Sequence, residues 1–174
     1  MTTPGVVLAT QDVLEQGLAL LSSVDDLLYC TKADEPFSAS VGGHYRHVLD
    51  HFLCLAAGMT SGSIDYDQRG RSRELETNRG QAERMTQLLM QSFRTLSGSR
   101  LEESCEVVHT VAYSVDGPEQ IQSTFARELA FCVSHAVHHF AIIRLICSHL
   151  SVPTNADFGI APSTLHYRRE QAAN

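Results

Sequence analysis

The sequence predicts an all-α protein, a four-helix bundle with long connections and a small β excursion before the last helix. Three segments carry apolar residues at helical spacing, and a fourth, at about 124–149, is apolar almost all round and should be the most buried helix. Between them lies a segment rich in Val, Thr and Tyr, which favour strands. A chain of 174 residues can bury a sizeable core, so we expect one domain over 1–174.

The first two helices are separated by a loop that contains Pro36. The first helix is predicted at 8–30, where leucines and valines recur at helical spacing. Either Ser38 or Ser40 can cap the second helix, which should run to about residue 57, with Gly58 as its stop signal.

The second half of the chain starts with a turn-rich polar segment at 58–72, followed by a more polar third helix at about 72–97. A strand is predicted at 105–115, with a turn at 116–118 and a possible partner strand at 119–124. After the last helix, the tail should be irregular or form at most one helical turn. Because two connections are long, a simple up-down-up-down order of the helices does not follow from the sequence.

Composition and charge exclude several classes of protein. The formal net charge of −7 and the pI of about 5.6 argue against a nucleic-acid partner. The basic stretch at 69–73 is interpreted as a solvated loop. No uninterrupted apolar run approaches the roughly 20 residues that cross a bilayer, and the N-terminus lacks the features of a signal peptide. We therefore expect a cytoplasmic protein without a membrane partner, whose cysteines are reduced.

Histidines are the most informative residues of the chain, because six of the nine fall in two short segments that are predicted to be helical. They are His44, His47, His51, His135, His138 and His139. Each helical residue advances by about 100°, so the first three form one stripe along the second helix. On the last helix His135 and His139 are an i, i+4 pair within reach of a single ion, whereas His138 should point elsewhere.

Two helices that present inward histidines are one way in which a bundle builds a metal site. Three imidazole ligands would leave a coordination position open, as in catalytic centres. The donors suit a divalent transition metal such as Zn, Ni or Fe, without selecting one. Bound there, the ion would lower the pKa of a water or thiol. In the alternative interpretation the histidines are core residues, although burying an unpartnered imidazole costs about 1–3 kcal/mol.

The same residues carry a resemblance to a known family. The run RHVLDH in the second helix and the run HAVHH in the last helix resemble the DinB/YfiT superfamily of metal-dependent enzymes, which is unrelated to the DNA polymerase of the same name. The resemblance spans nearly the whole chain, including the run RELAFCVSHAVHHFAII. It implies a four-helix bundle with one long crossover, and a homodimer.

The resemblance also implies a set of metal ligands. Family members hold a divalent metal with one histidine from the second helix and an H-x-x-x-H pair from the last helix, which here is His135 and His139. His47 best matches the other position, because it precedes the Leu-Asp of its VLD run as the family histidine does. His44 and His51 depart from the family pattern, and each stays open as an alternative ligand or as a cavity-lining group.

Three further residues are assigned on weaker grounds. His138 is interpreted as structural or as support for a neighbouring ligand. Arg46 and Arg127 lie close to the ligand-bearing segments and could reach an anionic substrate or a carboxylate. The chain contains no G-x-S-x-G, P-loop or dinucleotide-binding motif, so its sequence does not support a serine hydrolase of that type, a P-loop NTPase or a dinucleotide-binding dehydrogenase.

Characterised relatives use low-molecular-weight thiols, so the resemblance implies a thiol-dependent S-transferase or isomerase. A metal-activated thiolate, or a water in a metal-assisted hydrolase, would attack a small-molecule substrate. Two alternatives stay open. One is a non-catalytic bundle that binds a metal or a small ligand, and the other is a metal-free helical dimer whose histidines pack in the core.

Overall fold

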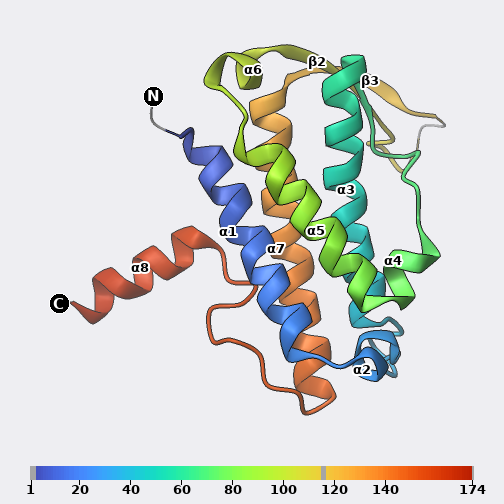
Figure 1. Ribbon diagram of the computed structural model, residues 1–174, viewed down its shortest axis with the longest axis vertical. Helices are drawn as coiled ribbons and strands as arrows, with labels where there is room; N and C mark the ends of the chain where they lie inside the picture. The colour runs from blue at the N-terminus through green and yellow to red at the C-terminus, as the bar shows by residue number, and fades with distance from the viewer. Residues whose placement is uncertain (1–2, 115–116, 174) are drawn as a thin grey trace.

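Four long helices lie side by side in the computed structural model, which describes residues 3–114 and 117–173 (Figure 1). They are α1 (Gly5–Ser23), α3 (Val41–Ser61), α5 (Arg79–Arg94) and α7 (Phe125–His149). Each of them packs against two others, so that the order around the bundle is α1, α5, α3, α7. The predicted all-α bundle is confirmed.

The connection between α3 and α5 is the long crossover of the bundle. It leaves the end of α3 and runs back along the molecule to α4 (Arg73–Thr77), so that α3 and α5 point in the same direction, opposite to α1 and α7 (Figure 1). As a result α3 and α7, the two histidine-bearing helices, are antiparallel neighbours.

A small sheet covers one end of the bundle (Figure 1). Its strands in the described chain are β1 (Ser63–Asp65), β2 (Ser104–His109) and β3 (Glu119–Thr124). β2 pairs parallel with β1 and antiparallel with β3. The two predicted strands are confirmed, but the first ends at His109, and residues 115–116 of the predicted strand and turn lie outside the described residues. β1 was not predicted, because its pairing partner lies some forty residues away in sequence.

Two predicted helices are each divided by a capping residue. The first one ends at Ser23, and Asp25 caps the short α2 (Asp26–Cys30) by accepting a hydrogen bond from the Leu28 backbone. Between α4 and α5, Asn78 adopts an extended conformation and caps α5 in the same way. A further short helix, α6 (Gly98–Glu102), lies directly before β2. Side chains that compete for backbone N–H groups favour such breaks over a continuous helix.

The second helix begins as predicted, since the Ser40 hydroxyl accepts a hydrogen bond from the Gly43 backbone at 3.0 Å. The predicted stop at Gly58 was wrong, because α3 continues to Ser61 and ends at Gly62, which has a φ of +82°. Gly58 serves a different purpose: a Cβ there would lie 2.3 Å from Ile64, so glycine allows β1 to approach the helix closely.

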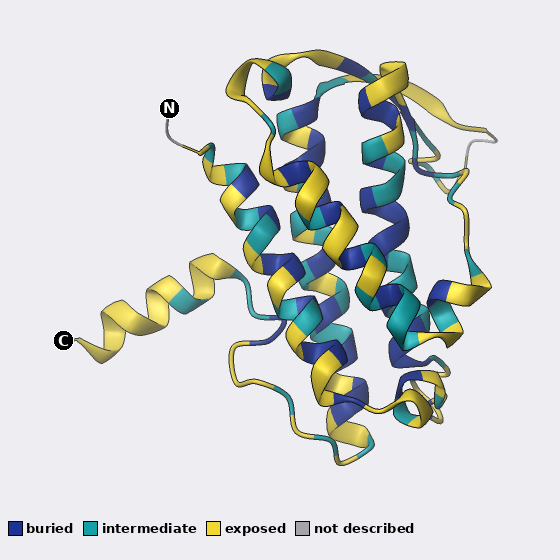
Figure 2. Ribbon diagram, in the orientation of Figure 1, coloured by how far each residue is buried: buried dark blue, intermediate teal, exposed yellow. Residues whose placement is uncertain are grey.

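The C-terminal tail differs from its prediction, since Pro162–Ala172 form the helix α8. Proline at the start of a helix is favourable, because its missing N–H has no partner there in any case. Within the described chain α8 buries none of its side chains, and it projects away from the bundle (Figures 1 and 2).

α7 packs against α1 and α3 and contains fully buried residues, among them Ala136, Phe140 and Ile143. Figure 2 shows buried positions along its length in dark blue. By length and composition alone it could also cross a membrane, which the sequence analysis did not anticipate. The core helix of a soluble protein passes the same test. The remaining faces of α7 carry half-buried and exposed residues, with His135 and His139 half-buried and His138 exposed.

Candidate metal centre

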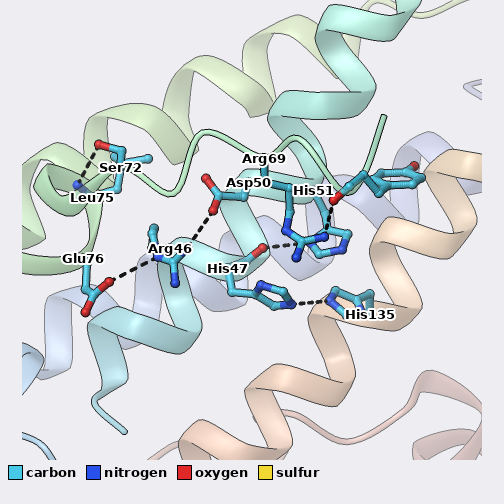
Figure 3. A network of polar contacts seen from close by, with 10 residues as sticks. Arg46, His47, Asp50, His51, Arg69, Ser72, Leu75, Glu76 and His135 are labelled. Atoms are coloured by element: carbon cyan, nitrogen blue, oxygen red, sulfur yellow. Dashed lines mark hydrogen bonds and ion pairs between the residues drawn. The ribbon is translucent and has the colours of Figure 1, made fainter. Parts of the chain in front are cut away.

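Three histidines from α3 and α7 converge at one place in the bundle. His47, His135 and His139 each offer a ring nitrogen, and these nitrogens all lie within 4.8 Å of one another. Figure 3 shows His47 and His135 pointing towards each other, with their Nε2 atoms 3.0 Å apart. The antiparallel packing of the two helices brings together residues that are about ninety positions apart in sequence.

This donor set fits a divalent transition metal. Tetrahedral nitrogen ligands that are about 2.0–2.1 Å from a zinc ion are separated from one another by about 3.4 Å. The separations found here need only small side-chain adjustments to reach that value. All the nitrogens are imidazole, the ligand that zinc, nickel and iron share.

Burial keeps the three rings in the neutral form that metals bind. It lowers the pKa of His47 and of His135 to about 4, and that of His139 to about 2. Neighbouring positive charges act in the same direction, with Arg69 and Arg46 lowering the pKa of His47. Each of the three neutral rings therefore has one nitrogen with a lone pair that can bind a metal at neutral pH.

His44 contacts this group through the ring of His139. Its Nδ1 lies 3.0 Å from the Nδ1 of His139, so one ring donates a proton and the other accepts it. A partner of this kind fixes the orientation of a ligand imidazole and leaves its other nitrogen directed at the metal. Burial also lowers the pKa of His44.

His51 is the most buried of these histidines, with 3% of its surface exposed. Its Nδ1 donates a hydrogen bond to the backbone carbonyl of His47 at 2.9 Å (Figure 3). Its ring stacks on that of Tyr66, at a centroid distance of 5.4 Å. Burial lowers the pKa of His51 to about 3. The structure therefore places His51 in the packing around the three histidines and outside the group itself.

His138 is exposed and lies on a different side of α7 from the pair, as the helical rotation predicts. Its ring meets that of His139 edge to face. Arg127, near the start of α7, is also exposed, and its guanidinium lies 5.9 Å from the ring centre of Phe131. Neither residue lines the cavity described below.

Arg46 is held between two carboxylates. Its Nη1 donates to the buried Asp50 at 2.9 Å, and its Nε lies 3.3 Å from a carboxylate oxygen of Glu76 in α4 (Figure 3). Burial raises the pKa of Asp50, while the guanidinium of Arg46 opposes that shift. Arg46, which directly precedes His47 in α3, thus links this helix to α4 in the crossover.

Arg69 is a site residue that the sequence analysis missed. It was assigned to a solvated loop, but it is half-buried and its side chain extends from the crossover towards His51 (Figure 3). The guanidinium donates to the backbone carbonyl of Tyr66, and its Nε is buried without a hydrogen-bond partner among the described residues. No local pattern in the sequence distinguishes this arginine from its two exposed neighbours.

The crossover is anchored by a buried carboxylate that was also missed. Glu128, 5% exposed, accepts hydrogen bonds from the Tyr66 hydroxyl at 3.0 Å and from Ser123 at 2.6 Å. Burial raises the pKa of Tyr66, so its hydroxyl keeps its proton. The contact fixes the ring that stacks on His51.

A cavity of about 380 Å³ gives access to the histidines. It is lined by Lys32, Ser38, Ala39, Ser40, Gly43, His44, Arg46, His47, Glu76 and His139. Two larger cavities lie along α1, and neither of them is lined by any of the clustered histidines. Because it alone of the three is lined by clustered histidines, we take the smallest cavity as the candidate functional one.

The chain is similar in sequence to part of a longer fungal protein. No family model matches the chain. A protein from Rhizopus delemar described as FK506-binding protein 5 is 30% identical over 162 residues, which are 91% of this chain. The chain spans only 38% of the length of that relative.

A solved structure supplies a comparison of the fold. The crystal structure of a DinB-like protein from Bacillus subtilis, YjoA, superposes with a TM-score of 0.55, covering 86% of this chain and 96% of the other. The sequence identity is 18%, which is low enough that the likeness speaks for the fold alone. We conclude that this chain has the fold of the DinB-like proteins.

Proposed function

We propose that the protein is a divalent-metal-dependent enzyme of the DinB-like type, with His47, His135 and His139 as ligands of Zn, Ni or Fe. The observation that carries the proposal is the convergence of these three neutral imidazoles from two helices. Two of them, His47 and His139, also line a cavity. Three protein ligands beside an open cavity are typical of centres that keep a coordination position for a small molecule.

When bound, such an ion supplies Lewis acidity, which lowers the pKa of a thiol or a water beside the histidines. The reaction that we propose is a thiol-dependent S-transfer or isomerisation, in which a thiolate attacks an electrophilic small molecule. In the transfer the new carbon–sulfur bond displaces a leaving group, which takes up the thiol proton, and in the isomerisation the thiolate adds and is eliminated again. Metal-assisted hydrolysis is the corresponding reaction with water. Within the protein, His44 orients the ring of His139, and the paired Arg46 holds α3 against the crossover.

A non-catalytic bundle that binds a metal or a small ligand is the second candidate. One observation favours it: Glu76, the one carboxylate among the described residues that line the cavity, is already paired with Arg46. Apart from the histidines, the described lining therefore offers no free general base.

The remaining partners are part of the same proposal. We propose a small-molecule substrate such as a low-molecular-weight thiol, a homodimer, and a cytoplasmic location without nucleic-acid or membrane partners. The net charge of −7 supports the absence of a nucleic-acid partner, since phosphate backbones repel an acidic protein.

The test is metal content, measured by elemental mass spectrometry on protein purified without a chelator or a metal-binding tag. Wild type should carry about one ion per chain, and the double variant His135→Ala/His139→Ala should carry none. His138→Ala is the matched control, because it removes an exposed histidine from the same helix and should keep the ion. Wild type that stays metal-free after incubation with zinc, nickel and iron would support the histidine-core alternative instead.

Catalysis is tested separately on the metal-loaded protein. Turnover of a thiol with an electrophile, lost in the double variant, would support the enzyme. Stoichiometric metal without any thiol or substrate turnover would favour the binding bundle.

A further inference from the structure

We infer that Lys32 is a specificity-determining residue, which pairs with the carboxylate of an acidic thiol at the mouth of the histidine cavity. The inference rests on the proposed function, because it presumes a thiol at the metal centre, and it names the class of that thiol.

Three charged side chains line the cavity, and two of them are paired. Arg46 contacts both Asp50 and Glu76, so neither Arg46 nor Glu76 is free to hold a ligand. Lys32 has no ion pair with any described residue and is exposed. An anionic ligand can therefore pair with Lys32 without breaking an existing ion pair in this cavity.

The backbone around Lys32 is held in place. Lys32 and Ser40 form an antiparallel bridge, and the neighbouring Ala33 donates a backbone hydrogen bond to Ala39 at 2.9 Å. Ser40 is also the cap of α3. These contacts fix the base of the lysine side chain beside the first turn of the helix that carries His47.

The first turn of α3 also favours an anion at this place. It contains no acidic residue, so no side chain competes for the positive end of the helix dipole. Gly43 lies in this turn and lines the cavity. Lys32 and the N-terminus of α3 therefore both contribute positive potential to the same part of the cavity.

The cavity has space beside Gly43 that no side chain fills. A Cβ at Gly43 would meet only the Ser40 hydroxyl, at 3.4 Å, which is close to ordinary contact. The adjacent Gly42 is different, since a Cβ there would lie 2.1 Å from the Glu76 carbonyl oxygen. A side chain introduced at Gly43 should thus fill the cavity without disturbing the packing.

The experiment measures thiol binding to the cobalt-substituted protein, through the sulfur-to-cobalt charge-transfer absorption. The probes are N-acetylcysteine and its carboxamide, which have the same shape and differ in the carboxylate. Lys32→Gln removes the charge and keeps most of the side-chain length, and Lys32→Arg restores a cation. Cobalt content is determined for every variant, so that metal loss is recognised independently.

An exposed ion pair is weak, so we expect Lys32→Gln to raise the Kd for N-acetylcysteine by roughly two- to fivefold and to leave that for the carboxamide unchanged. Lys32→Arg should restore the wild-type Kd. The preference should also shrink at high ionic strength, because salt screens exposed charges. If Lys32→Gln affects both probes equally, or neither of them, the inference is wrong although the thiol site stands.

A second variant checks the place of binding. Gly43→Leu should keep its cobalt and lose the charge-transfer band with both probes, because the leucine occupies the cavity. Unchanged binding in Gly43→Leu would show that thiols do not use this cavity, and would overturn the role of Lys32. Absence of the band in cobalt-loaded wild type would contradict the proposed thiol chemistry itself, and the inference with it.

Discussion

The Nε2 atoms of His47 and His135 lie 3.0 Å apart across the interface of two antiparallel helices. Both rings are half-buried, and burial lowers both pKa values to about 4. Two neutral imidazoles at this distance can share one proton, whereas a metal ion would use both lone pairs at once. The nearby His139 provides a third lone pair for the same ion.

Removing His47 should have a larger effect on metal affinity than removing His44. His47→Ala takes away one of three ligands, and we expect it to abolish stoichiometric binding. His44→Ala removes only the partner of His139, which should weaken the affinity by about 10- to 100-fold. Competition with a chelator of known affinity measures both. Equal loss in the two variants would make His44 a ligand in its own right.

The metal-free protein should lose stability as the pH falls below about 6.5. In the unfolded chain histidines titrate near pH 6.5, whereas burial lowers the pKa of His47 to about 4 and that of His51 to about 3. Between these values the unfolded state binds protons that the folded state does not, so the free energy of unfolding decreases with falling pH. Stability is complete above pH 6.5 and declines towards pH 4.

Urea denaturation at pH 7.5 and pH 5 tests this dependence. The difference should become smaller in His51→Gln, which removes one of the buried imidazoles, and should persist in His138→Gln, which alters an exposed one. A slope that is unchanged in His51→Gln would mean that other groups cause the pH dependence.

Adjacent glycines in α3 should respond oppositely to alanine. Gly42→Ala would place a Cβ 2.1 Å from the backbone oxygen of Glu76, and we expect a loss of about 1–3 kcal/mol in the free energy of unfolding. Gly43→Ala meets no such obstacle, and the higher helix propensity of alanine should stabilise by up to about 1 kcal/mol. Chemical denaturation of both variants supplies the comparison, and a similar loss in the two would contradict the close contact at Gly42.

Tyr66→Phe should destabilise the crossover. The substitution keeps the ring that stacks on His51 and removes the hydroxyl that donates to the buried Glu128. Leaving a buried carboxylate with one donor fewer costs about 1–3 kcal/mol. Tyr167→Phe, on the exposed α8, is the control and should be neutral. A neutral Tyr66→Phe would show that Ser123 alone satisfies the carboxylate.

Local patterns predicted much of the secondary structure. Ser40 caps α3 as expected, since a capping hydrogen bond involves neighbours in sequence. The strands around residues 105 and 120 were recognised from their composition and the turn between them. The predicted boundaries were wrong at the capping residues Asp25 and Asn78, which divide two predicted helices, and at Gly58. At Gly58 the sequence showed a glycine near a helix end, while the reason for that glycine is the approach of Ile64.

By itself the sequence determined that two helices carry histidine stripes, because the helical period relates the spacing of two residues to the side of the helix on which each of them lies. It also placed His138 on a different side of the helix from the pair, and the structure agrees. Only the tertiary structure decided which histidine of α3 joins that pair. His44, His47 and His51 share one face, and the choice among them depends on the axial register of α3 against α7, which is set by core packing along both helices. The same holds for Arg69 and Lys32, whose positions follow from the path of long connections that local sequence does not encode.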